Sequence, residues 1–220
     1  MVLYAGTSPK YIHTFEINNK EFMWWQYVPI FSLGDAGIVM PCPNLNWIRP
    51  IVGESIAAMD GFNKGYNHIY ATVKSTFVDP IEGSFGNRPG WHIDGFGSED
   101  TNFIWTDLNP TEYFMIDDGD SIIKLSEDHN KSMEQMETLV EALPQFIRSD
   151  CQKPYDLMML DNKCIHRVNP FGKAGFRNFV KISFSDELYL AEGNSINHNL
   201  DYDWETIPRK ETRNCPQGGK

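Results

Sequence analysis

The sequence predicts a mostly β protein with two flanking helices in a single domain. The chain has 220 residues, of which 41% are hydrophobic, and this suffices for one sizeable core. Short runs rich in β-branched and aromatic residues are separated by turn residues, which is typical of a β-meander. Only two segments carry apolar residues at helical spacing. Because no repeat, low-complexity tract or Gly/Ser linker divides the chain, we expect one domain over residues 1–220.

The first helix is predicted over residues 51–63, where Ile51, Ile56 and Met59 recur near helical spacing before two glycines. A long strand follows over residues 66–78, YNHIYATVKSTFV, and ends before Asp-Pro. We expect the helix to flank the sheet that contains this strand.

Three shorter strands are predicted next, at residues 102–108, 111–116 and 121–125, because Asn-Pro and Asp-Asp-Gly-Asp turns separate these runs. A second helix is predicted over residues 132–147, where Met136, Leu139, Val140 and Leu143 share one face. We expect a capping box of Ser132 and Gln135 at its start, and Pro144 to end or kink it. Two returning strands, at residues 156–168 and 176–185, precede a polar tail at 186–220.

Composition limits the partners and the location. Lys plus Arg is 19 against 30 for Asp plus Glu, and the resulting net charge of -11 opposes non-specific binding to nucleic acid. DNA would therefore need a local basic groove. The four cysteines form no CxxC pair, and the chain has neither a basic leader nor an apolar run of about 18 residues. We expect a cytoplasmic protein with no membrane span.

Three residues form a candidate metal site. His92 and Asp94 are two apart in a segment that reads as a strand, so both point to the same face, although an HxD pair arises often by chance. His166 lies 74 positions later in another β segment, and a barrel could bring it opposite the pair. Two histidines and one carboxylate are the ligand set of non-heme Fe(II) oxygenases.

Arg177 completes the pattern, eleven residues after His166 at the start of FRNFVKISFS. Its guanidinium would suit the distal carboxylate of a dicarboxylate whose other end chelates the metal. The joint pattern of PGWHIDGF and CIHRVNPFGKAGFRNFVKISFS resembles the Fe(II)/2-oxoglutarate-dependent oxygenase superfamily, in its compact phage and bacterial form. The resemblance covers residues 66–185, roughly half of the chain.

The resemblance implies a double-stranded β-helix, or jelly-roll, barrel over about residues 66–185, with the tail at 186–220 outside it. It implies that His92, Asp94 and His166 bind Fe(II), that Arg177 binds 2-oxoglutarate, and that dioxygen is consumed, with ascorbate as reductant in vitro. Many members carry a serine two positions after the arginine, where this chain has Phe179. The second carboxylate donor must then come from elsewhere. Its candidates are Asn102, Tyr113, Thr106 and Ser183.

The implied activity is a dioxygenase that hydroxylates an unactivated C–H bond while 2-oxoglutarate is decarboxylated to succinate and CO2. The first substrate hypothesis is the methyl group of thymine or 5-methylcytosine, in a nucleotide or in DNA. Trp91 and Phe96 would stack on the base, and Arg88 and Arg167, beside the proposed ligands, would line a local basic groove.

Other interpretations stay open. The substrate could be a free amino acid or another small metabolite, with Arg88 or Arg167 as its carboxylate clamp. A non-catalytic β-barrel binding module is the alternative of another class. Taken singly, His92 suits a surface loop, His166 a hydrogen-bonded strand position, and Arg177 an ion pair with Asp186 or Glu187. The sequence leaves the oligomeric state open.

Overall fold

Two antiparallel sheets pack against each other in the computed structural model, which describes residues 3–60, 65–95, 97–116 and 123–209. The larger sheet has six strands. Their order across the sheet is β2 (Lys10–Thr14), β9 (Asp156–Leu160), β5 (Thr101–Thr106), β11 (Gly175–Ser185), β4 (His68–Val78) and β3 (Met23–Ser32).

The smaller sheet has the order β10 (Ile165–Val168), β6 (Thr111–Phe114) and β8 (Ile147–Arg148). His92 extends it by one antiparallel bridge to His166, on the side of β10 that β6 leaves free. A further antiparallel pair joins β1 (Leu3–Ala5) to β7 (Ile123–Leu125).

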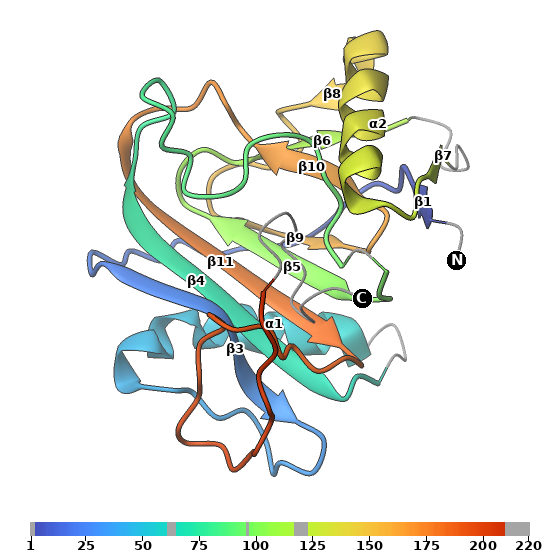
Figure 1. Cartoon of the computed structure of the whole chain (residues 1–220). Coiled ribbons are helices and arrows are strands. Elements are labelled where there is room, and N and C mark those ends of the chain that lie inside the picture. Colours follow the sequence, from blue (N-terminus) through green and yellow to red (C-terminus); the bar gives the residue numbers. More distant parts are fainter. Residues whose placement is uncertain (1–2, 61–64, 96, 117–122, 210–220) are drawn as a thin grey trace.

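Helices cover the outer faces of the two sheets (Figure 1). The 3-10 helix η1 (Pro43–Ile48) and the helix α1 (Arg49–Asp60) lie against the six-stranded sheet, and α2 (His129–Ala142) lies against the smaller one. A short 3-10 helix, η2 (Pro144–Phe146), follows α2. The layer under α1 is a continuous apolar core, and each fully buried aliphatic or aromatic side chain in it contributes about 1.5–3 kcal/mol. Its members include Ile48, Ile51, Phe103, Trp105, Val180 and Ile182.

The space between the sheets holds a smaller apolar cluster beside polar groups. Ile104, Met158 and Phe179 of the large sheet pack there against Tyr113 of β6 and Cys164 just before β10. The large sheet therefore has one apolar face, under α1, and one mixed face, toward the small sheet.

The sequence located most of these elements. Strands β4, β5, β6 and β11 and both helices are confirmed within a few residues, and α2 ends before Pro144 as expected. Residues 61–63 of the first predicted helix and residues 121–122 of a predicted strand lie outside the described residues. No element was predicted before residue 51, and the sequence analysis therefore missed β1, β2 and β3.

Two predictions are wrong in detail. The helix α2 starts at His129, because Asp128 caps it by accepting a hydrogen bond from the Lys131 amide at 3.0 Å; Ser132 lies inside the helix and forms no capping box. The predicted strand over residues 156–168 is two strands, β9 and β10, in different sheets. Asp161 turns the chain between them, since its carboxylate accepts from the Lys163 amide at 2.9 Å.

In the parts of the chain that the structure describes, no helix is both long and apolar enough to cross a bilayer. Cys42, Cys151 and Cys164 are free thiols.

Candidate metal centre

The two candidate histidine ligands are held together by their own backbones. The His92 amide donates to the His166 carbonyl at 3.0 Å, and the His166 amide donates to the His92 carbonyl at 2.9 Å. Residues opposed in this way lie side by side across a sheet, and the two imidazole rings are 4.5 Å apart between centroids. Outside this bridge, the segment around His92 is not the regular strand that the sequence predicted.

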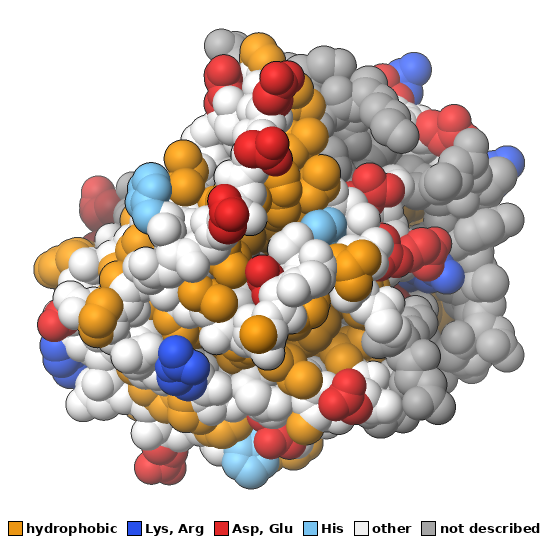
Figure 2. Space-filling model, turned by 90° about the horizontal axis from the view of Figure 1, so that it is seen from below, with side chains coloured by type: hydrophobic (Ala, Val, Ile, Leu, Met, Phe, Trp, Pro, Cys, Tyr) orange, Lys and Arg blue, Asp and Glu red, His pale blue; other side chains and the backbone are white. Residues whose placement is uncertain are grey.

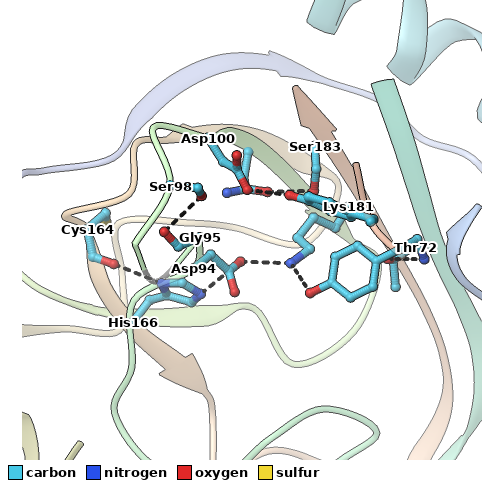
Figure 3. Close-up of polar contacts among 12 residues, drawn as sticks. Thr72, Asp94, Gly95, Ser98, Asp100, Cys164, His166, Lys181 and Ser183 are labelled. Atoms are coloured by element: carbon cyan, nitrogen blue, oxygen red, sulfur yellow. Dashed lines mark hydrogen bonds and ion pairs between the residues drawn. The ribbon is translucent and has the colours of Figure 1, made fainter. Parts of the chain in front are cut away.

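Asp94 joins the histidines from the turn that follows. Gly95, with φ of 68°, starts the turn, and its carbonyl accepts from the Ser98 amide at 2.8 Å. The Asp94 carboxylate lies 3.6 Å from Nε2 of His166 (Figure 3). One ligand atom from each of His92, Asp94 and His166 lies within 4.8 Å of the others. The structure therefore brings together the three residues that the sequence selected, in a group that can hold a metal ion.

Both imidazoles are oriented for ligation through Nε2. Nδ1 of His92 lies 2.9 Å from the Gly90 carbonyl oxygen, and Nδ1 of His166 lies 3.0 Å from that of Cys164. Because a carbonyl only accepts, each Nδ1 carries the proton and each Nε2 keeps its lone pair. Burial, with the neighbouring His166, lowers the pKa of His92 to about 3, and burial also lowers the pKa of His166. Both rings are thus neutral at neutral pH, as metal ligands must be.

Asp94 has a cationic neighbour of its own. The Lys181 ammonium lies 3.1 Å from Oδ2 of Asp94 and also donates to the Tyr27 hydroxyl at 3.2 Å. Burial opposes ionisation of Asp94, but Lys181 and the two histidines outweigh it and hold its pKa below the ordinary value. For Lys181, the attraction to Asp94 and Tyr27 outweighs burial and raises its pKa. Both groups are therefore charged.

A pocket of about 90 Å³ opens beside these ligands. Its lining combines the three candidate ligands with cationic and neutral polar side chains from both sheets. Those side chains are Lys74, Arg88, Arg167, Lys181, Gln26, Asn87, Tyr27, Thr72 and Thr111. Asp94 is the one acidic residue in this lining, although the chain carries a net charge of -11. The pocket is thus locally positive within an acidic protein.

Lys74 stands on the wall formed by β4, opposite Phe179 of β11 in the strand register. Its ammonium donates to the Gly86 carbonyl at 3.2 Å and lies 4.5 Å above the Trp24 ring. Burial, followed by the charges of Lys181 and Arg177, lowers its pKa to about 8. This ammonium is a cation with no described carboxylate within contact.

Arg177 is buried close by, with 2% of its surface exposed. Its Nε donates to the Leu108 carbonyl at 2.8 Å, and its guanidinium carbon lies 5.1 Å from the centre of the Phe179 ring. Nη2 is buried with no hydrogen-bond partner in the described structure, and burial lowers the Arg177 pKa to about 10. The guanidinium forms no ion pair with Asp186 or Glu187. It sits behind Phe179 and is not part of the pocket lining.

Two of the four other co-substrate candidates, Asn102 and Tyr113, are placed differently from the expectation. Asn102 of β5 lies opposite Ser183, six positions along β11 from Arg177, which is roughly 20 Å at strand spacing. The five-carbon chain of 2-oxoglutarate cannot reach both Asn102 and Arg177. Oδ1 of Asn102 accepts from the Ser183 hydroxyl at 2.6 Å, and Nδ2 of Asn102 is unpartnered in the described structure. Tyr113 lies opposite His166 but turns its hydroxyl to Gln152 at 3.1 Å.

The substrate candidates divide into two groups. Arg88 and Arg167 line the pocket. Arg167 is already paired with Glu112 at 2.8 Å and stacked over Trp91 at 4.4 Å. Trp91 is buried beneath it, with 2% exposed, so this ring offers no open face for a base. Phe96 lies outside the described residues.

Sequence reasoning missed Lys181, Tyr27 and Gln26. Lys181 had a detectable signal, because alternation along a strand places residues 177, 179 and 181 on one face. Tyr27 and Gln26 had none, since they lie on β3, for which no strand was predicted. Cys164 contributes its carbonyl to His166, while burial raises the pKa of its thiol well above the ordinary value, which disfavours the nucleophilic thiolate.

Comparison of the chain with protein-family models, curated proteins and solved structures finds no match.

Proposed function

We propose that this protein is an Fe(II)- and 2-oxoglutarate-dependent dioxygenase that hydroxylates an unactivated C–H bond. The observation that carries the proposal is the ligand group itself: two neutral imidazoles with free Nε2 atoms and one carboxylate, with ligand atoms within 4.8 Å of one another. This donor set suits Fe(II) and fills one face of the ion, which leaves positions for a chelating co-substrate and dioxygen.

The path of the chain supports a double-stranded β-helix. From β4 in the large sheet, the chain passes to His92 beside the small sheet, to β5 in the large one and to β6 in the small one. From β8 it alternates again, through β9, β10 and β11. Such alternation winds the chain around a shared interior, as in a jelly roll, and the ligands lie on that interior.

The cations support an anionic co-substrate. Iron would add two positive charges to a pocket where Lys74 and Lys181 face Asp94, with Arg177 close behind. A dicarboxylate offsets this excess, and the buried Nη2 of Arg177 is a donor without an acceptor. We assign the distal carboxylate of 2-oxoglutarate to Lys74 in the pocket lining and to Arg177 behind it, which requires the Phe179 ring to turn aside. Lys74 then replaces the hydroxyl that Phe179 cannot supply.

With these groups bound, dioxygen and 2-oxoglutarate convert R–H to R–OH, releasing succinate and CO2. The chain itself would hold the metal on His92, Asp94 and His166, orient the co-substrate through its cations, and exclude water with Ile104, Val168 and Phe179 of the pocket lining.

The substrate is best sought among small polar molecules. Gln26, Asn87 and Arg88 offer amide and guanidinium groups at the pocket, which suits a small metabolite or a free pyrimidine nucleotide. On the face shown in Figure 2, Lys and Arg side chains are scattered among acidic ones. The net charge of -11 likewise opposes binding of a long DNA strand.

Anaerobic titration tests the proposal. Purified protein receives Fe(II) and then 2-oxoglutarate, while the weak visible metal-to-ligand charge-transfer band is recorded. We expect the band in the wild type and in Asp60→Ala, a control at the exposed end of α1, and its loss in folded Asp94→Ala. A folded wild-type protein without the band would refute the proposal. If the band appears, succinate release with nucleotide, amino-acid and DNA pools identifies the substrate.

A further inference from the structure

The backbone of β3 is strained at the residue that touches Lys181. Tyr27 has φ of 47°, a left-handed conformation that is rare for a bulky side chain. The register of β3 against β4 shifts between Trp25 and Val28, so a bulge accommodates Tyr27. Its amide donates to the Thr72 hydroxyl at 3.1 Å instead of to a strand partner. The bulge turns the Tyr27 side chain into the pocket.

The segment after β11 holds this strained conformation in place. The Ser195 amide donates to the Gln26 carbonyl at 2.8 Å, and the Gln26 amide donates to the Ser195 hydroxyl at 2.9 Å. The Tyr189 ring packs edge-on against Tyr27 at 5.1 Å and stacks on Tyr70 at 4.0 Å. Strain of this kind persists where surrounding contacts overdetermine it, and it commonly marks a functional site.

The strained residue acts on Asp94 through Lys181. The ammonium bridges the Tyr27 hydroxyl, at 3.2 Å, and Oδ2 of Asp94, at 3.1 Å. Figure 3 shows the contact between Lys181 and Asp94. The Lys181 and Asp94 side chains are 9% and 15% exposed, so solvent screens this contact little.

We propose that Tyr27 and Lys181 form a clamp on Oδ2 of Asp94, the oxygen that lies 3.6 Å from Nε2 of His166, and that this clamp competes with a divalent metal for the carboxylate. The clamp rests on the proposed function only in that the site binds a metal. It makes Lys181 and Tyr27 positioning residues, which act through Asp94 and do not bind the metal themselves.

The clamp weakens metal binding, and this effect distinguishes it from a structural ion pair. A fixed ammonium next to the ligand repels the incoming dication and reduces the donor strength of the carboxylate. Metal binding is thereby weaker than the three ligands alone would give. If the ion pair between β11 and Asp94 only fastened the two sheets together, its loss would loosen the site and weaken metal binding. The two roles predict changes of opposite sign.

Co(II) is the probe, because its visible absorption reports coordination number without turnover. Full-length protein is titrated anaerobically in the presence of a competing chelator. The pH is about 8, so that Asp94 is ionised in every variant. For Lys181→Met we expect Co(II) to bind on the order of tenfold more tightly, because the ammonium no longer competes with the metal for Asp94.

Tyr27→Phe keeps the Lys181 ammonium but removes the hydroxyl that it donates to, and we expect a gain in Co(II) affinity about one third as large. It also serves if Lys181→Met fails to fold. Tyr66→Phe is the matched control, since the Tyr66 hydroxyl bonds Thr101, away from the pocket, at 2.8 Å. Unchanged or weaker Co(II) binding in folded Lys181→Met or Tyr27→Phe would overturn the clamp while the metal site stands. A wild-type protein that binds neither Co(II) nor Fe(II) would overturn both the clamp and the proposed function.

Discussion

The two faces of strand β11 carry different kinds of side chain. One face carries Val180, Ile182 and Phe184, which are buried in the apolar layer under α1. The other face, toward the small sheet, carries Arg177, Lys181 and Ser183, all nearly inaccessible to solvent. Both faces are buried, but the second places charged and polar groups beside the apolar cluster that contains Phe179 and Ile104.

The comparison shows how one strand separates stability from chemistry. The apolar face gains free energy from transfer out of water. The polar face must offset desolvation by specific partners, and the unpartnered Nη2 of Arg177 shows that this compensation is incomplete. We therefore expect substitutions on the two faces to change different measured quantities.

The largest effect on folding should come from the apolar face. Ile182→Ala removes a fully buried side chain from a packed layer, and we expect it to lower the free energy of unfolding by about 3 kcal/mol. Urea unfolding followed by tryptophan fluorescence measures this. Metal affinity of the folded variant should stay within about twofold of wild type. A large loss of affinity without a loss of stability would show that the two faces are not separate.

The polar face should give the reverse result. Arg177→Met removes a buried cation that lacks one partner, and we expect 2-oxoglutarate affinity to fall about 100-fold, with stability unchanged or higher. The readout is the charge-transfer band titrated with 2-oxoglutarate at saturating Fe(II). Arg177→Lys should restore part of the affinity. Equal losses of Fe(II) and 2-oxoglutarate binding would instead make Arg177 a structural residue.

A smaller effect on the same face is a pH dependence from Lys74. Its cationic form binds the carboxylate. Burial, followed by the like charges of Lys181 and Arg177, lowers its pKa in the metal-free site to about 8, against the opposing charge of Asp94. Affinity for 2-oxoglutarate should therefore be highest below about pH 8 and fall by up to about tenfold at higher pH, as the ammonium loses its proton. Bound carboxylate raises this pKa, so the complex loses affinity later than the free site titrates. Lys74→Met should bind more weakly with no such dependence, and parallel profiles would exclude Lys74.

The sequence was sufficient for features that depend on local pattern. Alternation within FRNFVKISFS predicts β11 and its two faces, and the HxD spacing with His166 selects the three residues that meet. Likewise, the spacing of eleven residues from His166 selects Arg177, whose guanidinium is buried near the pocket.

The remaining features depend on contacts between distant parts of the chain. Tyr27 reaches Lys181 across 154 positions, through a bulge that no local pattern announces. Arg167 covers Trp91 because the bridge between His92 and His166 brings β10 beside the segment that contains Trp91. No local pattern in the sequence indicates this contact. The cap at Asp128 was missed for another reason: Ser132 and Gln135 fit the capping-box pattern, but the helix starts earlier, at His129.

The position of β11 also has a consequence for how the protein reaches its native state. It is the last strand that the structure describes along the chain, yet it lies between β4 and β5, in the middle of the six-stranded sheet. During synthesis, β4 and β5 must wait with unpaired edges until residues 175–185 leave the ribosome. The sheet then closes by insertion across contacts of long sequence separation, which makes folding slow. The same strand delivers Lys181 to the pocket and Arg177 beside it, so the charged site cannot form before this strand joins the sheet.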